Sequence, residues 1–200
     1  MSVFPGTAGY PELASHFLSR RLSFEQVHEP FLHLIPQLPS RILDIGSGPG
    51  HDADTFAARG HTVVAVEPTD ALRLGAAARY RSSRIRWVAD GLPRLGVTRA
   101  LGERFDFVLM SGVWMHLSEP ERHEAMPQVV GLMAPGGVLA LSLRHGPVPH
   151  GRRMFPVSAQ ETTALAAAAG LEPVVTATRD SIQAANRAAG VRWTLLAFRN

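Results

Sequence analysis

An acid followed by a glycine-rich turn is the clearest chemical signature in this chain. Asp44 lies within the mainly apolar run 41–45, and Gly46, Gly48 and Gly50 follow that run. Glycine lacks a Cβ and readily adopts a positive φ, so such a turn lets a ligand approach the backbone closely. The apolar run predicts a buried strand, and a helical pattern follows the turn. Strand, glycine turn and helix N-terminus together form the opening unit of a nucleotide-binding α/β domain.

The spacing of the glycines distinguishes between classes of nucleotide. The dinucleotide fingerprint G-x-G-x-x-G needs its third glycine at the position of His51. Here that glycine comes one residue earlier, at Gly50, and the pattern reads Asp-x-Gly-x-Gly-x-Gly. This form resembles motif I of the class I S-adenosylmethionine (SAM) methyltransferases. The resemblance implies that the turn, Ser47 included, packs against the methionine and ribose portions of SAM, and that the product is S-adenosylhomocysteine (SAH).

Two further acids stand at the ends of predicted strands. Glu67 ends a β-branched run about 20 positions after the glycine turn, where a carboxylate can accept both ribose hydroxyls. Pro68 follows it and is expected to contact the cofactor as well. In methyltransferases that resemble this chain, the acid after the third strand accepts from the adenine amino group, and a neighbouring backbone N–H donates. That resemblance assigns the adenine end to Asp90, Gly91 and Leu92.

The second half of the chain resembles the same family. Phe-Asp-Phe-Val-Leu, then a His, a helix, Pro-Gly-Gly and an apolar strand occur in the family's order, so the resemblance covers residues 41–143. Ser111 and Val113 follow the fourth predicted strand and are expected to contact the cofactor. Trp114 is expected to contact the substrate. His116 is the candidate general base, since histidine titrates near neutral pH, and its alternative is a structural residue at a helix entry.

A basic loop after the fifth predicted strand is a candidate for binding the substrate. It contains Arg144, His145, Arg152 and Arg153, whose forked hydrogen bonds suit a carboxylate or phosphate. A solvated loop without a specific role is the alternative interpretation. No metal site is predicted.

The elements that must position these residues predict an α/β fold. We expect a Rossmann-like, seven-stranded, mostly parallel sheet with its last strand antiparallel, helices on both faces, and a short N-terminal helical lid. Residues 1–40 are predicted to form the lid or a plain cover of the sheet, and residues 41–200 the SAM-binding domain. Residues 1–10 are expected to be a flexible arm, and helices are expected over 11–21, 23–35, 51–59, 70–78, 118–133 and 158–170. The expected strands are 41–45, 61–67, 85–93 (the strand and its exit), 104–110, 138–143, 171–178 and 192–198, with a short, helical connection over 181–190.

Length and composition restrict the biological class. The chain has 200 residues, 46% of them hydrophobic, which suits one domain with an ample core. It contains no cysteine, so a disulfide framework and a cysteine nucleophile are excluded. We find neither a signal peptide nor an apolar stretch long enough to span a membrane, and expect a cytoplasmic protein. The net charge of +3 is weak evidence for a nucleic-acid partner, which we do not expect.

These observations predict a SAM-dependent methyltransferase that acts on an O or N atom of a small-molecule acceptor. The chain lacks the Asn/Asp-Pro-Pro-Tyr signature of base-amine methylation and the thiol needed for cytosine C5 methylation. A non-catalytic SAM- or SAH-binding protein is the alternative, followed by an NAD-dependent oxidoreductase and an RNA methyltransferase. The acceptor and the oligomeric state do not follow from the sequence.

Overall fold

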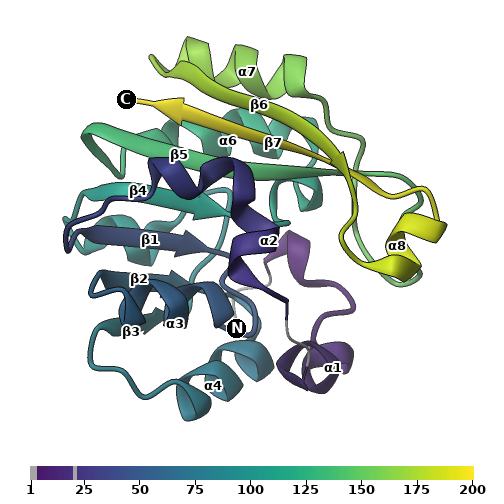
Figure 1. Ribbon diagram of the computed structural model, residues 1–200, viewed down its shortest axis with the longest axis horizontal. Helices are drawn as coiled ribbons and strands as arrows, with labels where there is room; N and C mark the ends of the chain where they lie inside the picture. Colours follow the sequence, from purple (N-terminus) through teal and green to yellow (C-terminus); the bar gives the residue numbers. More distant parts are fainter. Residues whose placement is uncertain (1–3, 20–21) are drawn as a thin grey trace.

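The computed structural model describes residues 4–19 and 22–200 and has one twisted sheet at its centre (Figure 1). Within these residues seven strands lie in the order β3-β2-β1-β4-β5-β7-β6. Their bounds are β1 Arg41–Ile45, β2 Thr62–Val66, β3 Ile85–Val88, β4 Phe105–Met110, β5 Met133–His145, β6 Glu172–Asp180 and β7 Arg192–Arg199. β7 is antiparallel to both of its neighbours, while the other neighbouring strands pair in parallel. The predicted fold class, including the antiparallel last strand, is confirmed.

The central strands are buried on both faces, as a continuous apolar run predicts. β1 pairs with β2 on one side and with β4 on the other, and its residues 42–45 are buried. Alternate residues supply two cores. Ile42 and Phe107 belong to one, whereas Leu43 and Val108 belong to the other.

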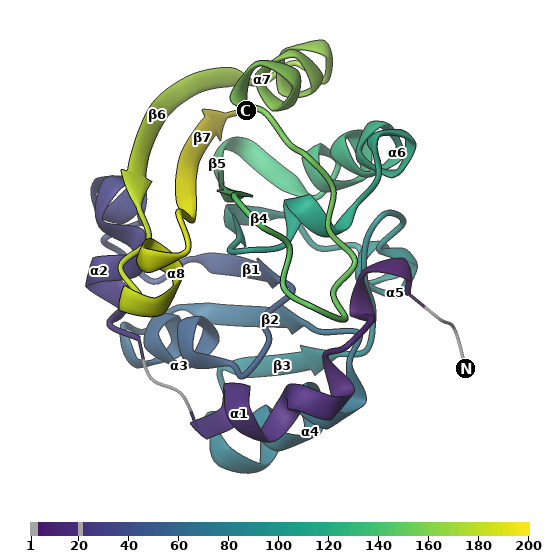
Figure 2. The ribbon, with the colours of Figure 1, turned by 90° about the vertical axis from the view of Figure 1, so that its right-hand side faces the viewer.

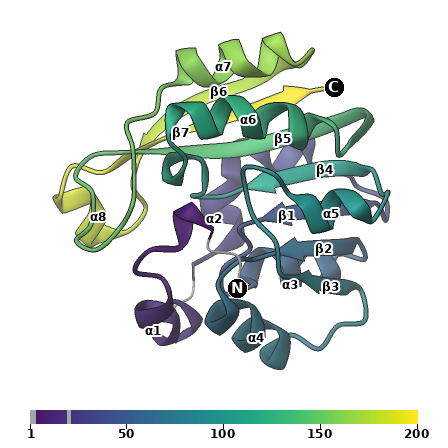
Figure 3. The ribbon, with the colours of Figure 1, turned by 180° about the vertical axis from the view of Figure 1, so that it is seen from behind.

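Helices cover both faces of the sheet, as predicted. One face packs against α2 (Phe24–His28), α3 (His51–Ala58) and part of α4 (Asp70–Arg79). From behind, α5 (Gly96–Ala100) and α6 (Glu119–Val130) cover the other face, with α7 (Ala159–Ala168) beyond them (Figure 3). The short α8 (Ala184–Ala188) lies in the predicted connection between β6 and β7. None of the helices in the described ranges is long and apolar enough to span a bilayer.

The N-terminal segment departs most from the sequence prediction. The described part of the expected flexible arm contains a 3₁₀ turn, η1 (Pro5–Thr7), and packs against the rest of the protein. The first expected helix is divided into η2 (Pro11–Leu13) and α1 (Ala14–Ser19), and Met1–Val3, Arg20 and Arg21 lie outside the described residues.

The second expected helix ends early. α2 gives way to the 3₁₀ segment η3 (Glu29–Leu34) because Pro30 cannot donate a helical backbone hydrogen bond. Its predicted N-cap is present, since Ser23 Oγ accepts from the backbone N–H of Gln26 at 3.2 Å.

Two boundaries in the second half were also misplaced. α6 ends at Val130 rather than at residue 133, and β5 begins at Met133 rather than at residue 138. The extra strand residues pair irregularly, with a register shift between Phe105 and Phe107 of β4. Gly136 N–H donates to Asn200 O at 3.0 Å, which draws the predicted turn into the sheet. α5 and the 3₁₀ turn η4 (Trp114–His116) were not predicted from the sequence.

Candidate active site

The glycine turn is fixed at the carboxyl edge of the sheet by its backbone. Gly46 N–H and Ser47 N–H both donate to Val66 O, at 2.8 and 2.9 Å, which ties the end of β1 to the end of β2. Gly46 has φ +71°, and a Cβ there would lie 2.5 Å from a methyl group of Val113. The turn therefore needs glycine at this position for both its conformation and its packing.

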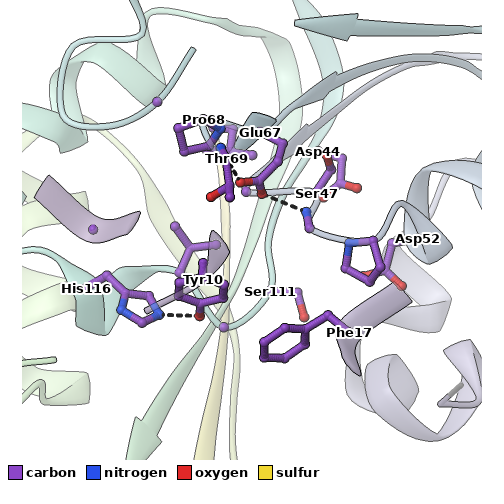
Figure 4. Close-up of a pocket in the computed structure, with 18 of the residues that line it drawn as sticks. Tyr10, Phe17, Asp44, Ser47, Asp52, Glu67, Pro68, Thr69, Ser111 and His116 are labelled. Carbon is purple, nitrogen blue, oxygen red and sulfur yellow. Dashed lines mark hydrogen bonds between the residues drawn. The ribbon is translucent and has the colours of Figure 1, made fainter. Parts of the chain in front are cut away.

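Glu67 connects the second strand to the same turn. The side chain is only 5% exposed, and its Oε2 accepts from Gly48 N–H at 2.9 Å (Figure 4). Its Oε1 accepts from Thr69 N–H at 2.7 Å. Burial raises the pKa of Glu67, and the two backbone donors oppose that rise. Glu67 thus holds the turn in shape while its carboxylate faces a cavity.

A cavity of about 320 Å³, here called the first cavity, opens beside this carboxylate. The glycine turn, the ends of β2 and β4, the loop after β3 and the N-terminal segment all contribute to its wall. All but two of the predicted cofactor residues line it. They are Asp44, Gly46, Ser47, Gly48, Glu67, Pro68, Gly91, Leu92, Ser111 and Val113.

The first cavity contains buried polar atoms without protein partners. Asp44 is 2% exposed, and neither its Oδ2 nor Ser47 Oγ has a hydrogen-bond partner among the described residues. Burial raises the pKa of Asp44 well above its ordinary range, and the nearby carboxylates of Asp52 and Glu67 raise it further. A buried acceptor left unpaired is unfavourable unless a ligand satisfies it. A ligand that donates hydrogen bonds and carries positive charge fits this wall.

Gly50 and Asp90, the two predicted cofactor residues outside this lining, have structural roles. Gly50 has φ +81° at the start of α3, and a Cβ there would lie 2.5 Å from the Trp87 ring. Asp90 Oδ1 accepts from Gly91 N–H at 2.9 Å, and Oδ2 accepts from Thr98 N–H and Oγ1 at 2.7 and 2.8 Å. The carboxylate is thereby turned toward the N-terminal end of α5, and the adenine contact expected for it stays a prediction.

His116 and Tyr10 form a hydrogen-bonded pair on the wall of the first cavity (Figure 4). His116 Nδ1 lies 2.7 Å from Arg153 O, and its Nε2 lies 2.9 Å from the Tyr10 hydroxyl. A carbonyl oxygen only accepts, so Nδ1 carries the hydrogen, and in the neutral ring Nε2 accepts from Tyr10. Burial and the cations Arg152, Arg153 and Arg144 lower the pKa of His116. The imidazole is therefore kept neutral and able to accept a proton.

The predicted substrate residues are mostly engaged in structural contacts. Trp114 is fully buried in the core, so it does not contact the substrate as expected. Arg153 pairs with Glu121 at 2.9 Å and donates to His116 O. Arg144 donates to Pro147 O, and His145 Nε2 lies 2.8 Å from Thr194 Oγ1; none of these side chains lines the first cavity.

Arg152 differs from the other basic residues of this loop. Its guanidinium lies 3.6 Å from the centre of the Tyr10 ring and 5.0 Å from that of Phe17. Its Nη1 is buried without a hydrogen-bond partner among the described residues. Arg152 therefore stabilises the N-terminal segment through cation–π contacts with these two rings.

Several residues that line the first cavity were not predicted from the sequence, among them Tyr10, Phe17, Asp52 and Thr69. The first two come from the segment expected to be flexible or a plain cover, and no local pattern connects them with the sheet. Asp52 and Thr69 directly follow the two predicted ligand-binding turns, so proximity along the chain could have identified them. In the described part of the chain, no group of His, Asp and Glu side chains is arranged to hold a metal.

Comparison with known proteins identifies the family. A family profile described as a methyltransferase domain matches residues 15–190. The chain belongs to this family. The match confirms the resemblance found in the sequence, a class I methyltransferase that uses SAM as its methyl donor.

Several solved structures share the fold of this chain. N-methyltransferase NodS from Bradyrhizobium japonicum WM9, in complex with SAH, has a TM-score of 0.71 and 18% identity, covering 94% of this chain and 97% of that chain. The 1,6-didemethyltoxoflavin-N1-methyltransferase of Burkholderia thailandensis has a TM-score of 0.65 and 23% identity, covering 100% of this chain and 92% of that chain. A TehB-like SAM-dependent methyltransferase from Corynebacterium glutamicum ATCC 13032 Kitasato has a TM-score of 0.68 and 18% identity, covering 94% and 95%. At these identities the likeness is one of fold. No curated protein matches the methyltransferase significantly in sequence.

Proposed function

We propose that this methyltransferase moves the methyl group of SAM to an O or N atom of a small-molecule acceptor and releases SAH. The observation that carries the proposal is the unpaired Asp44 Oδ2 in the wall of a cavity that the glycine turn and Glu67 also line. Two similar structures, N-methyltransferase NodS with SAH and the 1,6-didemethyltoxoflavin-N1-methyltransferase with 1,6-didemethyltoxoflavin and SAH, support this class of reaction.

The residues present fit SAM. Its amino group and sulfonium are cationic, and Asp44 and Ser47 offer unpaired acceptors in the same wall. Glu67 is proposed to accept from the ribose hydroxyls. When bound, SAM supplies an electrophilic methyl group, and the protein's contribution to the transfer is mainly to orient the acceptor in line with it.

The adenine end is proposed to lie against Pro68, Gly91 and Leu92, and the reacting end near Ser111 and Val113. All of these residues line the first cavity. This assignment follows the expectation from the sequence, except that Asp90 acts through its contacts with Gly91 and Thr98.

His116 is proposed to take up the proton that the acceptor loses. Its Nδ1–H donates to Arg153 O, which leaves Nε2 as the basic atom facing the Tyr10 hydroxyl. A proton from the acceptor passes to the Tyr10 oxygen as the Tyr10 proton moves to Nε2, which leaves an imidazolium. An ammonium acceptor thereby becomes a neutral amine, and a hydroxyl acceptor becomes an oxyanion that methylation neutralises. The lowered pKa of His116 keeps the base available near neutral pH.

The N-terminal segment is proposed to act as the lid over this site, within residues 1–40. Tyr10, Phe17, Leu22 and Val27 all line the first cavity, which a plain cover of the sheet would not require. The cytoplasmic location expected from the sequence is part of this proposal, as is the absence of a nucleic-acid partner.

Calorimetric titration tests the proposal. We expect SAM and SAH to bind with micromolar affinity and NAD not to bind. Glu67→Ala should weaken SAH binding at least tenfold, because hydrogen bonds to a charged group contribute about 1.5–3 kcal/mol. Glu172→Ala, an exposed acid at the start of β6, is the matched control and should bind as the wild type does.

The same titration distinguishes the alternatives. Failure of both SAM and SAH to bind would contradict the proposal, and NAD binding would favour the oxidoreductase. If SAH binds but no methylated product forms with a library of phenols, carboxylates and amines, the non-catalytic SAM-binding alternative is preferred.

A further inference from the structure

A second, smaller cavity adjoins the first. It measures about 160 Å³ and shares Leu22, Val27, Ser111, Gly112 and Gln183 with the wall of the first cavity. Ser111 and Gly112, which follow β4 and line both cavities, therefore separate the proposed cofactor site from the second cavity. Cavities of about 150 Å³ with apolar walls hold one benzene-sized ring. The second cavity has room for a ring but not for a second nucleotide.

The wall of the second cavity is mostly apolar and partly aromatic. Phe31 comes from the N-terminal segment, Leu195 and Trp193 come from β7, and Ile182 follows β6. Flat, apolar groups gain most from such a wall, through burial and aromatic contact.

The charged lining of the second cavity is cationic. Among the described residues Arg179 supplies this charge, His28 also contributes to the wall, and no Asp or Glu does. His28 Nε2 is already paired with Asp52 Oδ2 at 3.0 Å. Among residues 4–19 and 22–200, no carboxylate lies within ion-pair distance of Arg179. A buried cationic ligand would find no counter-charge in the described lining itself, whereas an anion would find Arg179.

The Arg179 guanidinium has further N–H groups that can donate hydrogen bonds to a ligand. Its guanidinium donates to Gln26 O at 2.6 Å and to Val27 O, which attaches the end of β6 to α2. These bonds use two of its five N–H groups. Burial lowers the pKa of Arg179, and the Glu29 carboxylate, which lies beyond ion-pair distance, opposes that shift. Figure 2 shows the end of β6 and the segment leading to α8 beside α2, where these contacts are made.

Hydroxyl groups complete the polar part of the wall. Ser142 Oγ accepts from Gly112 N–H at 2.8 Å, so its own hydrogen remains available to donate. Ser111 stands between the two cavities, on the side where the reacting atom of an acceptor has to face the cofactor.

We propose that the second cavity is the acceptor site. It selects a flat, ring-containing acceptor whose carboxylate or carbonyl oxygen is directed to Arg179. The inference rests on the proposed function and deepens it. Cationic amines are disfavoured, and the atom to be methylated lies at the Ser111 end of the ring.

The test compares three probes of one size and different charge: benzoate, benzyl alcohol and benzylamine. Each is titrated into the SAH-loaded protein while the indole N–H signals of the tryptophans are followed by NMR, with the Trp193 signal assigned from Trp193→Phe. We expect benzoate to shift the Trp193 signal and to bind at least fivefold more tightly than benzylamine. Arg179→Gln should weaken benzoate about tenfold, whereas Arg192→Gln, whose ion pair with Asp180 is exposed, should leave it unchanged.

A cavity-filling variant makes the location testable. Ile182→Trp should abolish benzoate binding and leave SAH affinity as in the wild type, since Ile182 lines only the second cavity. Equal binding of the three probes, a preference for benzylamine, or no binding of benzoate to a protein that binds SAH would overturn the inference while leaving the proposed function intact. Loss of SAH binding by the wild type would instead be the failure of the proposed function.

Discussion

Replacing Asp44 by Asn should stabilise the protein without its cofactor and weaken its binding of SAM. The wild-type carboxylate is 2% exposed with Oδ2 unpaired, and Asp52 and Glu67 raise its pKa further. An unsatisfied buried polar group costs about 1–3 kcal/mol, more if it is charged. The Asn amide removes the charge but keeps the shape. We therefore expect Asp44→Asn to gain about 1 kcal/mol near neutral pH, a rise in Tm of about 2–4 °C for a domain of this size.

The pH dependence of this gain has a defined sign. The folded-state pKa of Asp44 is raised, so its contribution to stability is complete below the ordinary aspartate pKa and is lost as pH rises through the folded-state value. The Asn variant lacks this titration. The difference in Tm between variant and wild type should consequently be small under acidic conditions and grow toward neutral pH, as scanning calorimetry in a pH series would reveal.

Cofactor affinity should change in the opposite direction. Loss of a hydrogen bond to a charged group costs about 1.5–3 kcal/mol, or roughly 10- to 150-fold in the SAM dissociation constant. Asp106→Asn is the matched control, because Asp106 is exposed at the start of β4 and accepts from Arg41 N–H, as an Asn oxygen can too. A lower Tm for Asp44→Asn at neutral pH, together with unchanged SAM affinity, would refute the reasoning.

Two further predictions concern the turn and the base. Gly48→Ala directs its Cβ into open space, with Gly46 O 3.9 Å away, so it should cost about 1–2 kcal/mol for its positive φ and weaken SAH at least tenfold by calorimetry. The Cβ of Gly50→Ala would lie 2.5 Å from the Trp87 ring, so this variant should lower Tm more than Gly48→Ala does. Equal Tm values for the two variants would contradict the structural role of Gly50. His116→Asn should lower kcat about 10²- to 10⁴-fold with an alcohol or protonated amine acceptor and remove the acidic limb of the pH–kcat profile, with SAH affinity retained. A pH profile unchanged from wild type, or the same loss in the exposed His123→Asn control, would exclude His116 as the base.

The sequence predicted the parts of the site that depend on local pattern. Gly46, Gly48 and Glu67 stand directly after apolar strands, and parallel strands bring their carboxyl ends to one edge, so their meeting could be anticipated. The contacts of Asp90 could not be predicted because α5 was not foreseen, and Thr98 N–H in that short helix donates to its carboxylate.

Contacts between distant segments could not be predicted in this way. Tyr10 and His116 are 106 residues apart, and the bond between them depends on how the N-terminal segment crosses the loop that holds Arg153. Trp114 was assigned to the substrate because it follows a strand, yet the turn η4 directs its ring into the core. A single sequence contains no periodic signal for such long-range packing.

The position of β7 has a consequence for how the protein forms during synthesis. β7 follows β6 along the chain but lies between β5 and β6, paired with both. When β6 leaves the ribosome, the strand that must attach it to the sheet has not been made, so β5 keeps an open edge until residues 192–199 emerge. Because Arg179 on β6 also donates to two carbonyls of α2, this contact between α2 and the sheet forms only after β6 has been made. The second cavity, which Arg179, Trp193 and Leu195 line, is therefore complete only when β7 has paired.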